Sequence, residues 1–239
     1  MSGHSKWSTI KRQKGVADAK RGQAFTKLTS AITLAVRQGG GIADPTSNFK
    51  LRLAIDKARG MNMPKENIER AIERASNASK DSFDEVLYEG FAPGGAALIV
   101  EAATDNKNRT TSEVKNLIEK NGGSMGGQGS VSYMFARRGE LVVKKDGKTA
   151  DDVMMVALDE GLEDIEEDDD VFFLYTAPEN LMKVKNVIES NGFEVENAEL
   201  VYKPGTTVAV DEETGQKIVD LMDKIEEHDD VQKVYSNVA

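Results

Sequence analysis

The order of apolar patterns between residues 139 and 201 constrains the fold of this chain more than any other feature. Short apolar or alternating runs predict four strands, at Leu141–Lys144, Asp164–Glu167, Val171–Thr176 and Glu194–Leu200. Helical spacing follows the first and the third of these strands, at Ala150–Asp159 and Glu179–Ser190. A βαββαβ order is the signature of the ferredoxin-like fold. This segment therefore predicts one complete ferredoxin-like domain.

The segments on both sides of it each contain only part of such a domain. Before it we predict strands at Glu85–Tyr88, Ala96–Ala103 and Val131–Phe135, with a helix at Thr111–Lys120. After it we predict one helix, Glu212–Glu227, and one strand, Val231–Ser236. A linear string of three domains is the alternative, but it leaves the last helix and strand without a core. We therefore expect a split α/β domain interrupted by an inserted one.

Residues 1–17 have no helical apolar period and predict an irregular basic arm, whereas residues 18–75 have the spacing of helices. Phe25, Leu28, Ile32 and Val36 lie on one helical face, and Gly39-Gly40-Gly41 ends that helix. Asp44-Pro45 predicts the start of a second helix that runs to about Gly60 and buries Phe49, Leu53, Ala54 and Ala58. Pro64 opens a third helix with Ile68, Ala71, Ile72 and Ala75 inward and a Glu66–Arg70 pair on its surface.

The predicted class is α+β, with a helical N-terminal domain and two ferredoxin-like α/β domains, one inserted in the other. The expected boundaries are 1–78 for the basic helical domain with its N-terminal arm, 79–137 and 202–239 for the split domain, and 138–201 for the acidic insertion.

Charge divides the chain in the same way. Residues 1–75 carry 15 Lys and Arg against 6 Asp and Glu, a net charge of +9, whereas residues 76–239 carry 16 against 35, a net charge of −19. An acidic protein with a strongly basic third is typical of a region that faces a polyanion joined to a region that faces something else. The alternative is a charge dipole that helps the domains to dock.

Several function classes find no support in the composition. The chain has no cysteine, which excludes disulfides, thiolate zinc sites and cysteine nucleophiles. Its only histidines, His4 and His228, have no identifiable nucleophile as a partner, and no phosphate-binding loop or dinucleotide fingerprint occurs. The longest strongly apolar run, 96–100, is too short to span a bilayer. We expect a cytoplasmic protein that is not an enzyme and needs no cofactor or metal.

The basic arm is the most informative segment for function. Lys and Arg neutralise phosphates and release counterions, and an exposed indole stacks on an unpaired base. The alternative is that the tryptophan packs against the helices and the cations are only solvated. The candidate nucleic-acid contacts are His4, Lys6, Trp7, Lys11, Arg12, Lys14, Lys20, Arg21 and Lys27.

Three further features have weaker functional interpretations. Asn108 and Arg109 lie at a predicted helix N-terminus, where Arg109 contacts either a phosphate or acids of its own domain. Gly126-Gly127-Gln128 copies the tripeptide by which release factors position water, although glycines in such a loop more often serve the backbone conformation. The acidic run 163–170 lacks the spaced ligands of a calcium loop and is interpreted as a solvated connection.

The N-terminal strings resemble one known family. GHSKW (3–7), IKRQKG (10–15), DAKRG (18–22), FTKL (25–28) and MPKENIERAI (63–72) are similar to the YebC/PmpR family, which includes bacterial transcriptional regulators and a mitochondrial translational activator. The resemblance continues through YEGFAPGG, DNKNRT, GGSMGGQGSVSYMF and DDVQKVYSN, and so covers essentially the whole chain.

This resemblance implies a helical first domain, two α/β domains with one inserted in the other, and gene regulation by nucleic-acid binding without a cofactor. It supplies no catalytic residues. The first expectation is a DNA-binding transcriptional regulator, and the alternative is a ribosome-associated factor that binds ribosomal or transfer RNA. Transcription or ribosomal proteins are expected partners of the acidic domains, and no membrane is expected. A hydrolase that uses Gln128 is a third class.

Overall fold

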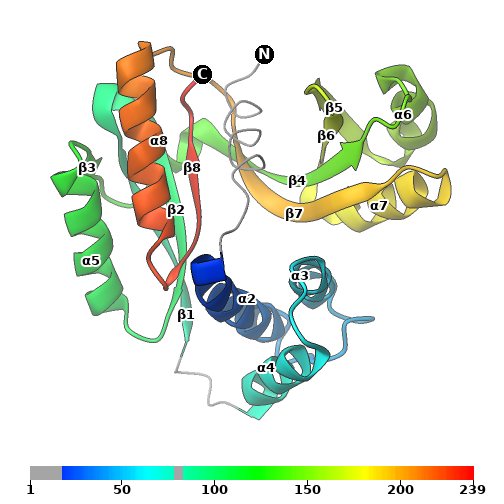
Figure 1. Ribbon diagram of the computed structural model, residues 1–239, viewed down its shortest axis with the longest axis horizontal. Coiled ribbons are helices and arrows are strands. Elements are labelled where there is room, and N and C mark those ends of the chain that lie inside the picture. The colour runs from blue at the N-terminus through cyan, green and yellow to red at the C-terminus, as the bar shows by residue number, and fades with distance from the viewer. Residues whose placement is uncertain (1–17, 78–82) are drawn as a thin grey trace. The chain divides into compact units, whose positions relative to one another are not determined.

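The computed structural model describes residues 18–77 and 83–239, which fall into two compact units (Figure 1). Phe135–Thr207 forms one unit, and the other contains the described residues before it together with Val208–Val238. The second unit is therefore built from two stretches that are separated by more than seventy residues of sequence. Among the described helices, none has both the length and the apolar character needed to cross a bilayer.

Three helices form the N-terminal part: α2 (Asp18–Gln38), α3 (Phe49–Gly60) and α4 (Lys65–Asn77). The predicted inward residues Leu28, Ile32 and Val36 of α2 are buried, and Phe25 packs partly against the same core. From α4, Ile68, Ala71 and Ala75 join them, whereas Ile72 is only partly buried. The helical spacing thus located this core correctly.

The predicted start of the second helix at Asp44-Pro45 is wrong. The carboxylate of Asp44 instead accepts hydrogen bonds from the backbone N–H and the hydroxyl of Thr46, at 2.9 and 2.6 Å, and so closes a turn. The helix begins at Phe49, after Asn48. Phe49 lies 39% exposed, so its predicted burial is also wrong.

Asn48 explains why the helix begins there. Its side-chain oxygen accepts the N–H of Leu51 at 3.1 Å, which caps the first turn of α3. Its amide group donates to the carbonyl oxygens of Ala35 and Ile42, at 2.9 and 3.0 Å. A nearly buried side chain (5% exposed) with three partners is a stronger helix start than an exposed aspartate four residues earlier.

The same unit contains a four-stranded antiparallel sheet with the order β3-β1-β2-β8. Its strands are β1 (Asp84–Phe91), β2 (Ala97–Thr104), β3 (Ser124–Met125) and β8 (Val231–Ser236), and its helices are α5 (Lys107–Lys120) and α8 (Glu212–Glu226). The two helices contact each other and the sheet. The expectation that the last helix and strand complete the earlier segment is confirmed.

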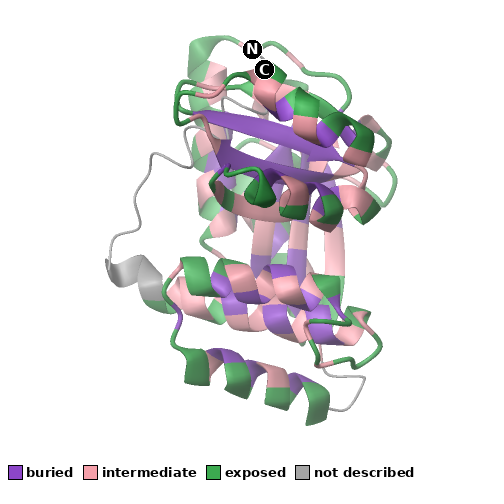
Figure 2. Cartoon of the chain, turned by 90° about the vertical axis from the view of Figure 1, so that its right-hand side faces the viewer, coloured by how far each residue is buried: buried purple, intermediate pink, exposed green. Residues whose placement is uncertain are grey.

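The inserted unit has the predicted βαββαβ order. It runs through β4 (Phe135–Lys144), α6 (Ala150–Ala157), β5 (Leu162–Glu167), β6 (Val171–Thr176), α7 (Leu181–Ser190) and β7 (Val195–Pro204). Its sheet has the order β5-β6-β4-β7, and every residue of β6 is buried (Figure 2). The inserted sheet therefore has the ferredoxin-like strand order, 2-3-1-4 in its own chain order, whereas the split sheet has the order 3-1-2-4. In the split sheet, a direct hairpin joins β1 to β2, and α8 with β8 arrives from the other end of the chain.

A separate strand at Val131–Phe135 is not formed, so that prediction is wrong. Ser132–Met134 is a 3-10 turn, and Phe135 is the first residue of the long strand β4. The reason is pairing, since β7 forms an antiparallel ladder along β4 from Phe135 onward. The apolar run was detected, but its partner strand lies seventy residues away in sequence.

Candidate nucleic-acid interface

The predicted nucleic-acid contacts lie at the start of the chain, largely outside the described residues. His4, Lys6, Trp7, Lys11, Arg12 and Lys14 precede residue 18. Lys20 and Arg21 belong to the first turns of α2, but their side chains are also outside the described part. The arm therefore stays a prediction from sequence.

Lys27 is the one predicted contact in this group whose side chain is described. It is half-buried, and its ammonium group donates to the backbone carbonyl of Glu226 in the last turn of α8. One turn earlier, the side-chain amide of Gln23 donates to the carbonyl of Glu227 and to the carboxylate of Asp229. A cation at a helix C-terminus satisfies carbonyl groups that lack intrahelical partners. Lys27 thus has a structural partner within the chain.

Arg109 is occupied by acids of its own unit. Asn106 caps α5 by accepting the backbone N–H of Arg109, and Asn108 is exposed beside it. The Arg109 guanidinium donates to the carboxylates of Asp230 at 2.7 Å and Asp105 at 3.1 Å. The bond and the charge of Asp230, followed by those of Asp105, raise the pKa of Arg109 above its ordinary value. Of the two alternatives open from sequence, the structure shows pairing with acids.

Asp230 is held by more than Arg109. Its carboxylate accepts the hydroxyls of Thr110 at 2.6 Å and Thr104 at 3.1 Å. Burial opposes ionisation of Asp230, but the bonds from Thr110 and Arg109 outweigh it, so its pKa lies below the ordinary value. The backbone N–H of Asp230 also donates to Nδ1 of His228, whose Nε2 lies 2.8 Å from the carboxylate of Glu113. This network joins the start of α5 to the chain after α8. Asp230 and Arg109 therefore have a structural role.

The glycine-rich loop after β3 is organised by a buried acid that sequence reasoning missed. The carboxylate of Glu89, 3% exposed, accepts the backbone N–H groups of Gly129, Val131 and Ser132 at 2.7 to 2.8 Å. Burial opposes its ionisation, but these three bonds outweigh it and hold the pKa of Glu89 below the ordinary value. The available signal for such a clamp was an acid that directly follows the apolar residues Val86, Leu87 and Tyr88 of β1.

One glycine of this loop, Gly129, has the conformational role expected of it. Gly129 has a φ of 85°, which favours glycine over any residue with a Cβ atom. A Cβ atom on Gly126 would lie 2.3 Å from the hydroxyl of Ser130. The loop that contains the Gly126-Gly127-Gln128 tripeptide therefore needs glycine at position 129, directly after the tripeptide, for its backbone conformation.

The acidic run 163–170 is mainly an edge strand and not a solvated connection. Its first residues belong to β5, which pairs with β6. Lys203 lies 2.6 Å from Asp164 and 3.0 Å from Glu166, and Lys145 lies 3.0 Å from Glu167. Within residues 18–77 and 83–239, no group of three or more His, Asp or Glu side chains is arranged to hold a metal ion.

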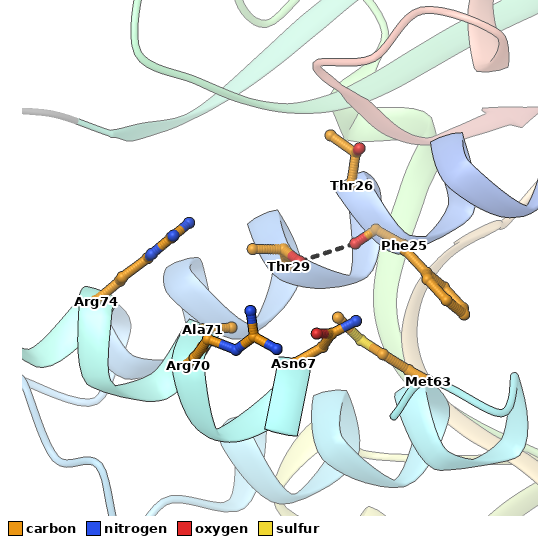
Figure 3. Close-up of a pocket in the computed structure, with 8 residues that line it drawn as sticks. All are labelled: Phe25, Thr26, Thr29, Met63, Asn67, Arg70, Ala71 and Arg74. Atoms are coloured by element: carbon orange, nitrogen blue, oxygen red, sulfur yellow. Dashed lines mark hydrogen bonds between the residues drawn. The ribbon is translucent and has the colours of Figure 1, made fainter. Parts of the chain in front are cut away.

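A pocket in the helical region brings cations together in the described structure. This α2–α4 pocket has a volume of about 200 Å³ (Figure 3). Its lining comes from α2 (Phe25, Thr26 and Thr29), from α4 (Asn67, Arg70, Ala71 and Arg74) and from Met63, which lies just before α4. Figure 3 shows Arg70 and Arg74 extending from α4 on the side toward α2, with Phe25 and Met63 at the other end.

Arg70 does not form the predicted ion pair with Glu66. Its Nε donates instead to the backbone carbonyl of Glu66, at 3.2 Å. The carboxylate of Glu66 accepts no bond from it, and the remaining guanidinium N–H groups of Arg70 have no partner in the part of the chain that the structure describes. The sequence placed Arg70 in a surface pair and gave no role to Arg74, because the pocket depends on the packing of α2 against α4.

Comparison with known proteins gives a consistent result over the whole chain. A family model described as the TACO1/YebC protein N-terminal domain matches residues 5–78, and one described as the TACO1/YebC second and third domain matches residues 83–238.

Relatives named "Probable transcriptional regulatory protein" include one from Persephonella marina, 50% identical over 99% of this chain and 95% of its own, and one from Treponema pallidum, 49% identical over 99% and 96%. The crystal structure of a conserved hypothetical protein from Aquifex aeolicus is 44% identical, covers 93% of this chain and 91% of its own, and has a TM-score of 0.85. Family models that together cover nearly every residue, and relatives of this identity, lead to one conclusion: the chain belongs to the TACO1/YebC family.

Proposed function

We propose that this protein is a DNA-binding regulator of transcription that acts in the cytoplasm without catalysing a reaction. The observation that carries the proposal is the division of charge. The first 75 residues have a net charge of +9, and the rest of the chain has −19. Cations of the basic region would neutralise DNA phosphates, and the acidic remainder would be repelled from DNA and left to contact protein.

The partners of cations in the acidic part support this division. Arg109 binds Asp230 and Asp105, Lys203 binds Asp164 and Glu166, and Lys183 lies 2.8 Å from Glu160. Such cations are already neutralised by their own domain. The names of the relatives also describe transcriptional regulation.

The test is binding of purified full-length protein to a fluorescent promoter duplex across a salt series. We expect the logarithm of affinity to fall steeply with the logarithm of salt concentration, since each neutralised phosphate contributes about 0.9 to the slope. Replacing Lys6, Lys11, Arg12, Lys14, Lys20 and Arg21 together by Gln should flatten the slope by up to about 5.

The matched control removes the same charge elsewhere. Six exposed lysines outside the basic region are replaced by Gln: Lys107, Lys115, Lys120, Lys183, Lys217 and Lys224. This control variant should keep the wild-type slope. Equal slopes for wild type and the arm variant would refute the proposed role of the arm. In-cell crosslinking that recovers ribosomal RNA and no promoter DNA would favour the ribosome-associated alternative.

A further inference from the structure

The α2–α4 pocket combines features that the structure of the helical region alone does not require. On α4, positions 67, 70, 71 and 74 form one stripe at helical spacing, and this stripe lines the pocket. It carries two arginines and one asparagine but no acid. The acids of the helix, Glu66, Glu69 and Glu73, occupy the neighbouring stripe at the same spacing. The pocket side of α4 is therefore cationic although the helix as a whole has no net charge.

Most polar groups on this stripe have no partner among residues 18–77 and 83–239. Among the described residues, Arg74 has no hydrogen bond or ion pair, and the side-chain amide of Asn67 also has none. Arg70 uses one N–H group on the carbonyl of its own helix. Elsewhere in the helical region, Arg52 donates to the carbonyls of Pro45 and Thr46 and thereby fixes the turn before α3. Arg70 and Arg74 serve no comparable internal purpose.

The other end of the pocket is apolar. Phe25 is half-buried against the core, and Met63 is 6% exposed. Between these ends, the hydroxyls of Thr26 and Thr29 donate to the carbonyls of Gly22 and Phe25 in their own helix, which leaves their oxygens as acceptors. The pocket thus has a cationic end, a polar middle and an apolar end with an aromatic ring.

The size of the pocket limits what it can hold. A volume of about 200 Å³ lies below the roughly 300 to 1,000 Å³ of pockets that enclose whole cofactors or drug-sized ligands. The pocket is suited to one planar group whose charged substituent lies outside the enclosed volume. A nucleotide has this chemistry, because its base is planar with polar edges and its phosphate is a bidentate partner for arginine.

We propose that the α2–α4 pocket receives one unpaired nucleotide of the bound nucleic acid. Its phosphate lies between Arg70 and Arg74, its base packs against Phe25 and Met63, and Asn67 hydrogen-bonds the edge of the base. This inference rests on the proposed nucleic-acid binding and adds a preference to it. Stacking and edge contacts need a base outside a duplex, so the protein should prefer a strand with unpaired nucleotides over a blunt duplex.

The experiment compares variants on two probes, a single-stranded oligonucleotide and a blunt duplex of the same sequence. Replacing Arg70 and Arg74 together by Gln should weaken binding to the single strand about tenfold or more and weaken duplex binding less. The matched control is Arg59→Gln with Lys65→Gln, which removes two exposed cations of the same region outside the pocket. This control should weaken both probes alike and only slightly.

Two further measurements separate base contact from general charge. Phe25→Leu keeps the charge and the apolar character but removes the ring, and it should reduce the preference for the single strand. Photocrosslinking with an oligonucleotide that carries 5-iododeoxyuridine should label peptides that contain Phe25 or Met63. Thermal unfolding of each variant establishes that it is folded.

The outcomes distinguish this inference from the proposed function. If wild-type protein binds neither probe, the proposed function fails and this inference with it. If wild-type protein binds, but the pocket and control variants weaken both probes equally, or the crosslinks map elsewhere, the pocket assignment is wrong and the proposed function stands. A tenfold selective loss with crosslinks at the pocket supports the inference.

Discussion

Two arginines in this chain show how differently the same side chain is used in its two kinds of region. Arg109, at the start of α5, donates to two carboxylates and is locked into a network with Asp230. Arg74, on α4, has no polar partner among the described residues and lines a pocket. In the amino-acid composition, each of these arginines counts as one positive charge. The comparison shows that composition does not distinguish an arginine that the fold has neutralised from one that has no polar partner among the described residues.

The contrast applies to acids as well as to arginines. In the α/β part of the larger unit, Glu89 and Asp230 hold a loop and a helix start through hydrogen bonds. We therefore expect charge-removing substitutions there to change folding stability, and charge-removing substitutions on the pocket side of α4 to change binding.

Glu89→Ala should have the largest effect on the free energy of unfolding. It leaves the backbone N–H groups of Gly129, Val131 and Ser132 without their acceptor, at one buried and two partly buried positions. We expect the free energy of unfolding to fall by about 3 kcal/mol, measured by urea denaturation. The affinity of the folded fraction for DNA should be unchanged. A variant as stable as wild type would show that the loop does not depend on this clamp.

The fold was largely predictable from the sequence because its periodic patterns are strong. The βαββαβ order and the completion of the split domain by the last helix and strand follow from apolar spacing and from the need of each element for a core. Boundaries that depend on distant residues were not predictable. Helix α3 begins after Asn48 and not at Asp44, because the Asn48 amide also donates to the carbonyls of Ala35 and Ile42. Strand β4 begins at Phe135 because β7 pairs with it from that residue onward.

The candidate site was less predictable for the same physical reason. The arm follows from charge composition, which needs no structure. The partners of Arg109 include Asp230, which lies 121 residues away, so sequence spacing left its role open. The α2–α4 pocket requires knowledge of which stripe of α4 faces α2, and the Glu66–Arg70 spacing suggested an ion pair that the structure does not contain.

Asp230→Ala should have the next largest effect on stability. It deprives the hydroxyls of Thr104 and Thr110 and the guanidinium of Arg109 of a common acceptor whose side chain is only 18% exposed. We expect a loss of about 2 kcal/mol in the free energy of unfolding, measured by thermal or urea denaturation. The salt dependence of DNA binding should equal that of wild type. A changed slope would mean that Arg109, once released, contacts phosphate.

The pH dependence of stability should report these two acids. Their pKa values lie below the ordinary values in the folded chain, so their contribution is present at neutral pH and is lost as pH falls through the folded pKa values. We expect stability to decline on acidification below about pH 4.5. The double variant Glu89→Gln, Asp230→Asn should be less stable at neutral pH and should lose less on acidification. If the double variant lost as much stability below about pH 4.5 as wild type does, these two acids would not be the source of the pH dependence.

Lys27→Gln should have the smallest effect on stability. It tests whether a cation of the basic region that has a partner within the chain also contacts phosphate. Sequence analysis grouped Lys27 with the phosphate contacts, but its ammonium group binds the carbonyl of Glu226 at the end of α8. We expect a stability loss below about 1 kcal/mol and a change in salt slope well below 0.9, the value for one lost phosphate contact. Lys20→Gln, seven residues earlier, should flatten the slope by about 0.9. If both variants flatten it equally, Lys27 exchanges its carbonyl partner for a phosphate on binding, and an internal hydrogen bond does not exclude a lysine from the interface.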